Sequence, residues 1–277
     1  MVENDNIMDD MQTLRFDDFD KALYIGTSSV IGKRREQQDA VLADDAISYI
    51  ENGKAIAILC DGMGGMNGGG MASSLCASIV YKTFHSGAPF PSIPAFFRAA
   101  IAEADDAVRM MRDENGALIS GAGTTLAAVV VDDNQLYWAS VGDSRIYIIR
   151  GDECLCITKD HNYLMLLNEK VKRGELTQEE AESDPNKEAL ISYIGIGGVR
   201  YIDISSKGVS LLDGDMIVLC SDGFYRTVSE AELVDALFDF GEDTQETAEA
   251  LTDLAISKDK RNQDNTSVIV LRYHESL

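Results

Sequence analysis

Two apolar segments of the chain end in the same way, and this repeated ending constrains the fold most. The segment AIAILC at residues 55–60 runs into Asp61-Gly62, and MIVLC at residues 216–220 runs, after one serine, into Asp222-Gly223. Short apolar runs bounded by turn residues are typical of buried strands. The chain therefore places a carboxylate at the end of each of two predicted buried strands.

The segment that follows Asp61 is unusually rich in glycine. Six of the ten residues from 61 to 70 are glycine. Glycine loses more conformational entropy on folding than other residues, so such a loop needs unusual dihedral angles or close access to its backbone. Two interpretations stay open: a sharp turn into the next helix, or a loop whose backbone lies against a ligand.

Three further aspartates stand at predicted strand ends. Asp143 follows a strand in YWASVGDSR, whereas Asp39 in REQQDAVL and Asp264 in QDNTSVIV precede strands. Any one of them could be only a turn residue. Five such positions indicate a shared site if the strand ends converge. Oxygen ligands without nearby histidine or cysteine favour Mg²⁺ or Mn²⁺ over zinc.

The order of the predicted elements indicates the fold class. Strands are predicted at 22–30, 40–50, 54–60, 189–194, 200–206, 215–220 and 265–273, with three or four more over 124–158. Helices are predicted at 69–84, 96–111, 162–184, 228–238 and 244–258. Runs of strands with grouped helices favour an α+β architecture of packed sheets covered by helices. We expect one domain over residues 21–277, preceded by a mobile acidic arm at residues 1–20.

The charge and the cysteines limit the function classes. The chain has 24 basic and 47 acidic residues, a net charge of −23. Such a surface repels nucleic-acid phosphates and anionic lipids. The chain has five cysteines, and an odd number of cysteines is typical of a reduced, cytosolic protein. The acidic, polar N-terminus is not typical of a signal peptide, and no apolar run is long enough to span a membrane, so we expect neither feature. We expect a cytoplasmic monomer that binds neither nucleic acid nor membrane.

Seven motifs in order resemble the bacterial form of the metal-dependent protein serine/threonine phosphatases of the type 2C (PPM) family. They are GKRREQQD (32–39), DGMGGMNGGGMAS (61–73), GTTL (123–126), VGDSRIYIIRG (141–151), ITKDHN (157–162), GDMIVLCSDG (214–223) and QDNTSVIV (263–270). The resemblance covers roughly residues 22–272. It implies a four-layer αββα sandwich with a metal centre between the ends of the two sheets.

The resemblance also implies which residues hold two metal ions. Asp61 would bridge both ions, and Asp222 and Asp264 would bind the first. The second ion would bind the Gly62 carbonyl and, through water, Asp39. Two divalent ions bridged by one carboxylate can share a water, lower its pKa and direct it at phosphorus.

Three further assignments come from the resemblance. Arg34 matches the phosphate-binding arginine, whose rigid fork a lysine would not reproduce. Asp143, together with Asp222, matches the ligands of a third, weaker metal ion. The charged segment at about 163–195 matches a flap beside the cleft.

The chain also departs from the family pattern. Met66 stands where relatives usually have histidine, and Gly70 stands where they have an acid. Gln37-Gln38 replaces an Asn-Glu or Asn-Gln pair, and LISYIG at 190–195 replaces a motif with a threonine and an arginine. None of these positions is an assigned metal ligand. They bear on proton delivery and on the docking of the flap.

Three functions follow as hypotheses. The leading one is a phosphoprotein phosphatase that opposes a serine/threonine kinase. The second is a catalytically weak or silent relative that binds phosphoproteins as a regulator. The third is another two-metal hydrolase, acting on nucleotides or phosphodiesters, which the scarcity of basic residues disfavours. Five retained residues argue against the second hypothesis: Arg34, Asp39, Asp61, Asp222 and Asp264.

Overall fold

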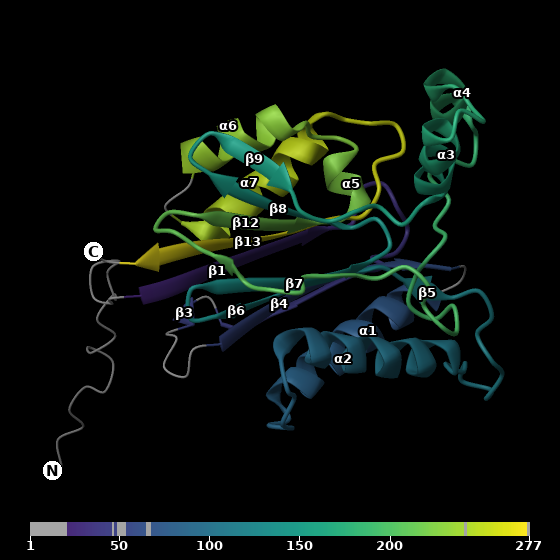
Figure 1. The fold of residues 1–277 in the computed structure, drawn as a ribbon, viewed down its shortest axis with the longest axis horizontal. Helices are drawn as coiled ribbons and strands as arrows, with labels where there is room; N and C mark the ends of the chain where they lie inside the picture. Colours follow the sequence, from purple (N-terminus) through teal and green to yellow (C-terminus); the bar gives the residue numbers. More distant parts are fainter. Residues whose placement is uncertain (1–20, 46, 49–53, 65–67, 241–242, 276–277) are drawn as a thin grey trace, which may run out of the picture.

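Two antiparallel sheets pack face to face in this chain, as the computed structural model shows (Figure 1). The structure describes residues 21–45, 47–48, 54–64, 68–240 and 243–275, so the expected arm at 1–20 lies outside it. In spatial order the first sheet contains β3 (Ile47–Ser48), β1 (Lys21–Val30), β13 (Thr266–Glu275), β12 (Met216–Cys220), β8 (Arg145–Arg150) and β9 (Glu153–Cys156).

The second sheet contains the strand that leads into the glycine-rich segment. In spatial order it contains β10 (Asp203–Ile204), β7 (Gln135–Val141), β6 (Leu126–Asp132), β4 (Lys54–Met63) and β2 (Asp39–Ala43). Two short strands join it at its margins: β11 (Val209–Ser210) pairs with β7, and β5 (Gly123–Thr124) pairs with β4.

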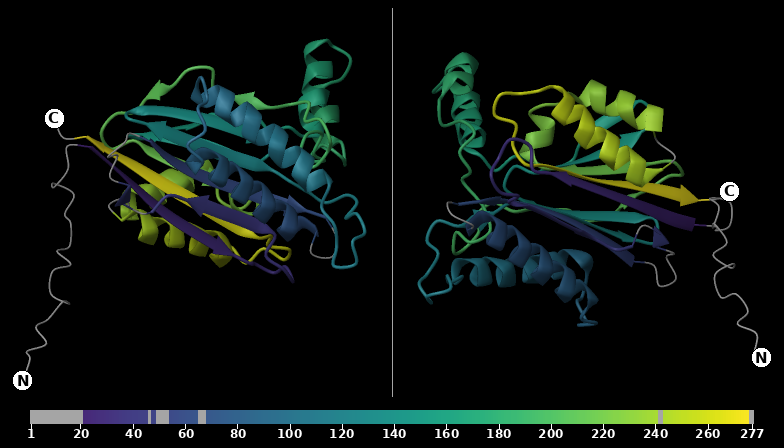
Figure 2. Two further views of the ribbon diagram at one scale, coloured as in Figure 1. Left: turned by 90° about the horizontal axis from the view of Figure 1, so that it is seen from below. Right: turned by 180° about the vertical axis from the view of Figure 1, so that it is seen from behind.

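Helices cover both outer faces of the pair of sheets (Figures 1 and 2). The second sheet is covered by α1 (Gly68–His85) and α2 (Ile93–Arg109), and the first by α5 (Asp222–Tyr225), α6 (Glu230–Phe240) and α7 (Thr244–Ser257). The expected four-layer α+β sandwich is thereby confirmed. Among the described residues, no helix combines the length and the apolar character that crossing a membrane requires.

The alternation of side chains along a strand explains why the central strands are apolar throughout. In β4, Ala57 and Leu59 lie in the core between the sheets, whereas Ile56, Ile58 and Cys60 lie in the core beneath α1 and α2. Successive side chains point to opposite faces, so a strand buried on both faces needs an unbroken apolar run. The run ends at Asp61, where the strand leaves the core.

The helices α3 (Tyr163–Lys172) and α4 (Gln178–Ser183) project from one end of the sandwich. This end lies opposite the start of β1 and the end of β13 (Figure 1). The predicted strand at 189–194 is wrong: this segment forms only isolated bridges, Leu190 with Asn162 and Ile194 with Thr124. Its apolar residues close the base of the helical projection instead of entering a sheet. The sequence also gave no signal for α5.

Candidate metal centre

Two of the predicted site residues face each other directly. Asp39 begins β2 and pairs in register with Asp61 near the end of β4. Side chains at opposite positions of an antiparallel pair project to the same face, with Cβ atoms about 4.5–5.5 Å apart. Two like charges in that arrangement destabilise a sheet unless a cation lies between or beside them.

The other predicted carboxylates converge on the same end of the sandwich. Asp143 follows β7, Asp222 begins α5 directly after β12, and Asp264 precedes β13. Together with Asp61 and Gly62 they line a cavity of about 410 Å³, here called the acidic cavity. The remaining residues that line it are Arg34, Gln38, Met63, Gly64, Thr125, Glu188, Leu190, Arg226 and Asn265. The structure thus brings the predicted residues together, with Asp39 beside Asp61.

The environment of Asp39 fits a bound cation. The side chain is buried, and the Ser221 hydroxyl donates to its Oδ2 at 2.8 Å. Among the described residues its Oδ1 is buried without a hydrogen-bond partner. Burial, followed by the charges of Asp222 and Asp264, raises the pKa of Asp39 to about 6. A buried carboxylate oxygen without a partner is costly, so a cation there would stabilise it.

The negative charges of four other aspartates act on Asp61. Burial, followed by the charges of Asp39 and Asp222, raises the pKa of its carboxyl well above the usual range. Such clusters of acids are typical of functional sites and bind hard cations through oxygen. The cluster of carboxylates is therefore a candidate site for divalent cations.

Carboxylates alone do not complete a ligand set here. Within the described part of the chain, no three His, Cys, Asp or Glu side chains form a group that could hold one metal ion. The Gly62 backbone and water would have to supply the remaining ligands. Mg²⁺ ordinarily keeps several waters and uses one or two carboxylates, which suits this arrangement.

Two threonines of the GTTL motif hold the backbone of Asp61 in place. Its N–H donates to Thr125 Oγ1 at 2.9 Å, and its carbonyl accepts from the Thr125 N–H at 2.8 Å. The Thr124 hydroxyl donates to the same carbonyl at 2.9 Å. We assigned these threonines no role from the sequence, although the motif itself was visible. Their contacts fix the strand end from which the Asp61 carboxylate projects.

Close contact between two glycines explains part of the glycine-rich segment. A Cβ at Gly62 would lie 2.2 Å from the Gly69 carbonyl oxygen and 2.6 Å from that of Gln38. No side chain fits there, so the start of α1 can pack against the end of β4 only through bare backbone. Gly62 also borders the acidic cavity, so the two interpretations of this segment are compatible. Residues 65–67, including Met66, lie outside the described residues.

Arg34 reaches the acidic cavity from the loop between β1 and β2. Its Nη2 donates to Asp264 Oδ2 at 2.5 Å, and 58% of its side chain is exposed. The guanidinium thus has one carboxylate partner and a large free face toward solvent. This geometry leaves donors available to a phosphoryl group.

Asn265 shapes the loop that carries Arg34, and the sequence analysis missed it. Its Nδ2 donates to the carbonyls of Ile31 at 2.9 Å and Glu36 at 3.0 Å. Its Oδ1 accepts the backbone N–H of Gln38 at 2.8 Å. This buried amide therefore joins both ends of the loop to the start of β13. The only sequence signal was its place beside Asp264 in the QDN motif.

A buried carboxylate on α2 anchors the base of the predicted flap. Asp105 accepts the backbone N–H groups of Gly195 at 2.7 Å, Gly197 at 3.2 Å and Gly198 at 2.6 Å. Asp105 is only 4% exposed. Glu188, closer to the helices of the flap, lines the acidic cavity. The flap is therefore fixed at its base and borders the site.

No histidine lines the acidic cavity among the described residues. His161 is buried, and its Nδ1 accepts the Gly142 N–H at 3.2 Å. Burial lowers its pKa, which agrees with a neutral ring that accepts this bond. His161 therefore shapes the turn before Asp143.

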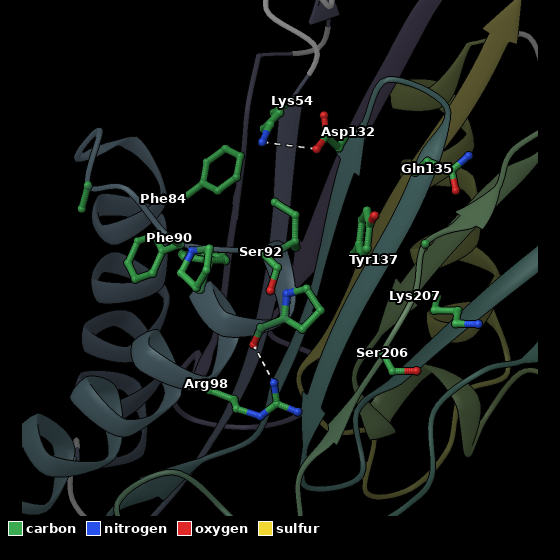
Figure 3. A pocket seen from close by; sticks show the side chains of 16 residues that line it. Lys54, Phe84, Phe90, Ser92, Arg98, Asp132, Gln135, Tyr137, Ser206 and Lys207 are labelled. Atoms are coloured by element: carbon green, nitrogen blue, oxygen red, sulfur yellow. Dashed lines mark hydrogen bonds and ion pairs between the residues drawn. The ribbon is translucent and has the colours of Figure 1, made fainter.

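A cavity larger than the acidic cavity lies elsewhere. It has a volume of about 870 Å³ and lies between the second sheet and the helices that cover it (Figure 3). At one edge Lys54 pairs with Asp132 at 3.2 Å, and Phe84 and Phe90 project from the helical side. Lys54 is seven residues from Asp61 along β4, roughly 23 Å in an extended strand. Cavity size thus does not identify the acidic site.

Comparison with known proteins agrees with the geometry. The family protein phosphatase 2C matches residues 31–257. Protein phosphatase PhpP of Streptococcus pneumoniae is 32% identical over 206 residues, which cover 73% of this chain and 79% of that protein. The serine/threonine phosphatase stp of Listeria innocua is 28% identical over 221 residues, covering 78% of this chain and 83% of that protein.

Solved structures share the fold. The S. agalactiae serine/threonine phosphatase superposes with a TM-score of 0.75 at 28% identity, covering 92% of this chain and all of that one. The catalytic domain of PstP in complex with two manganese ions superposes with a TM-score of 0.72 at 28% identity, again covering 92% of this chain and all of that one. The chain therefore belongs to the protein phosphatase 2C family of metal-dependent serine/threonine phosphatases, and the resemblance seen in its motifs is confirmed.

Proposed function

We propose that the acidic cavity is where this chain hydrolyses phosphoserine and phosphothreonine in proteins. Asp39, Asp61, Gly62, Asp222 and Asp264 would hold two Mn²⁺ or Mg²⁺ ions there. The observation that carries this proposal is the opposed pair of Asp61, which lines the cavity, and Asp39, whose buried Oδ1 has no hydrogen-bond partner among the described residues. The two manganese ions of the PstP complex support the choice of metal.

In hydrolysis the oxygen of a water molecule bonds to phosphorus, the bond between phosphorus and the serine or threonine oxygen breaks, and that oxygen takes a proton as inorganic phosphate is released. When bound, two divalent ions would stabilise charge on the phosphoryl oxygens and lower the pKa of a water. Arg34 binds and orients the phosphoryl group through its free donors while Asp264 holds the guanidinium in place. No cysteine or serine nucleophile is required.

The surroundings of the reaction are part of the proposal. The substrates are phosphorylated proteins, and the enzyme opposes a serine/threonine kinase as a monomer in the cytoplasm. The excess of acidic over basic residues supports a role away from nucleic acid and membrane surfaces. It does not exclude an anionic phosphopeptide, because salt screens surface charges beyond about 8 Å.

The experiment measures Mn²⁺-dependent phosphate release from a phosphothreonine peptide in wild type, Asp61→Asn and Asp152→Asn. Asp152 is an exposed turn residue and serves as the control. We expect Asp61→Asn to reduce release to background while the control stays active. Chelation should abolish activity reversibly. Full activity in excess EDTA would contradict the proposal.

The same assay separates the alternative functions. Tight binding of the phosphopeptide with no turnover at saturating Mn²⁺ would favour the silent phosphoprotein-binding relative. Faster release from a nucleotide or a phosphodiester than from the peptide would favour a different two-metal hydrolase.

A further inference from the structure

Arg226 extends into the acidic cavity from the end of α5. It lies four residues after Asp222, so one helical turn brings the two side chains together. Its Nη2 donates to Asp143 Oδ2 at 3.2 Å and is 3.4 Å from Asp222 Oδ2. One guanidinium nitrogen thus joins two carboxylates, one from the turn after β7 and one from the start of α5.

The guanidinium is fixed on its other sides as well. Its Nη1 lies 2.7 Å from Oε2 of Glu188 in the flap. The centre of the Tyr225 ring lies 5.9 Å from the Arg226 Cζ and 3.8 Å from the Arg145 Cζ. Arg145 is itself held by two hydrogen bonds to Asp160, at 2.8 and 3.1 Å. Arg226 therefore belongs to a connected network of charged and aromatic side chains.

One oxygen of the Asp143 carboxylate is already engaged by other side chains. Its Oδ2 accepts both from Arg226 and from the Tyr225 hydroxyl, each at 3.2 Å. Asp143 is only 5% exposed, so its surroundings are largely protein. A divalent ion shared by Asp143 and Asp222 would have to displace the guanidinium or bind beside its positive charge. The pair does not fit the third metal ion that the resemblance assigns to it.

We propose that Arg226 is the third cation of this site. Its guanidinium takes the position between Asp143 and Asp222, so the enzyme binds two metal ions rather than three. Through Glu188 it also ties the flap to the metal centre, which makes Arg226 a positioning residue. This inference rests on the proposed metal centre, because it assumes that the other carboxylates hold two ions.

The test counts bound Mn²⁺ by equilibrium dialysis against Mn²⁺ alone, without substrate. We expect two ions in wild type and a third, weaker ion in Arg226→Gln. The double variant Arg226→Gln with Asp143→Asn should return to two ions. Arg226→Lys, which keeps the charge, should also bind two. Arg173→Gln is the matched control, since Arg173 pairs with Glu175 in the flap.

Three ions in wild type, with the third lost in Asp143→Asn, would overturn the inference. Two ions in Arg226→Gln would also overturn it, because removal of the guanidinium would then open no site. Binding of no ion to any variant would contradict the proposed metal centre itself, and this inference with it. Melting curves in EDTA verify that each variant is folded before ions are counted.

A second readout tests the link to the flap. Trypsin can cleave the flap after Lys170, Lys172 and Arg173. We expect Arg226→Gln and Glu188→Gln each to raise the cleavage rate several-fold, and the double variant to add nothing further, because both remove the same ion pair. Unchanged cleavage in both single variants would overturn the proposed link.

Discussion

Asp39 and Asp61 occupy opposite positions in the ladder between β2 and β4, and the contacts that hold them come from both sheets. Ser221, at the end of β12 in the first sheet, donates to Asp39, whereas Thr125 beside β6 holds the backbone of Asp61. The site therefore forms only when the two sheets pack together. Metal binding should in consequence stabilise the whole fold, since a preformed site does not exist in the unfolded chain.

The first prediction concerns pH and stability in EDTA. The pKa of Asp39 rises from 3.8 to about 6 on folding, so its protonated form is favoured in the folded state. This contribution is present below about pH 4 and is lost as the pH rises through about 6. For Asp39 alone the loss is on the order of 3 kcal/mol. Urea denaturation between pH 4 and 7.5 measures it.

Two controls sharpen this measurement. Asp39→Asn should reduce the pH dependence, whereas Asp152→Asn should leave it unchanged. Mn²⁺ should raise the melting temperature more at pH 7 than at pH 5, because it binds ionised carboxylates. A metal-free protein that grows more stable between pH 5 and 7 would contradict the prediction.

The second prediction compares two adjacent arginines. Arg34 lines the acidic cavity, whereas Arg35 is exposed and is not among its lining residues. A charge-assisted phosphate contact is worth about 2–3 kcal/mol, so Arg34→Ala should raise KM for a phosphopeptide by roughly ten- to a hundredfold. The KM of Arg34→Lys should lie between those of the wild type and Arg34→Ala, because lysine keeps the positive charge but lacks the planar, bidentate guanidinium. Equal KM values for Arg34→Ala and Arg35→Ala would remove Arg34 from the site.

The third prediction tests the anchor of the flap. Asp105→Ala leaves three N–H groups without their acceptor and should lower the free energy of unfolding by about 2–4 kcal/mol. Its neighbour Asp106 is the control: its side chain is 76% exposed and pairs with Arg109 on the helix surface. Asp106→Ala should cost less than about 0.5 kcal/mol. Urea denaturation of both variants decides the matter, and equal losses would show that Asp105 is no special anchor.

The fourth prediction follows from the absence of a histidine among the described residues that line the acidic cavity. A positioned general acid typically accelerates release of an alkoxide by about 10²–10⁴-fold. An aryl phosphate leaves as a stable anion and needs no such acid. We therefore expect p-nitrophenyl phosphate to be hydrolysed disproportionately well relative to a phosphothreonine peptide.

Met66→His tests the reason for that preference. The family resemblance assigns a histidine to this position, so the substitution should raise kcat/KM for the peptide alone. Met63→His, in the same segment, serves as the comparison. If Met66→His changes the rates for both substrates equally, or changes neither, proton delivery is not what position 66 controls.

The sequence by itself determined the layers and the chemistry of the site. Strands buried on both faces must be apolar throughout, so AIAILC and MIVLC were recognisable without a structure. Aspartate at their ends was equally visible, because a charged side chain ends such a run. The order of the seven motifs along the chain then indicated the family, because that order matches the family pattern even where the residues between the motifs differ from it.

Only the tertiary structure decided which side chains support these residues. Asn265 and Gln38 meet across 227 positions of sequence, and Gly195 reaches Asp105 across 90. Such partners leave no local periodicity, because their contact depends on how the sheets and helices pack. The segment 189–194 shows the converse error: its apolar residues resemble a strand, yet tertiary packing places them at the base of the flap.

Arg226 illustrates the same division most clearly. In the sequence it is one basic residue after SDGFY, and no pattern distinguishes it from a solvated arginine. Folding brings Asp143 from β7 and Glu188 from the flap to the helix that carries it. The sequence determines the charge of a side chain, but residues that are distant in sequence determine the electrostatic field around that charge. Coulomb interactions depend on separation in space, and only the fold fixes that separation.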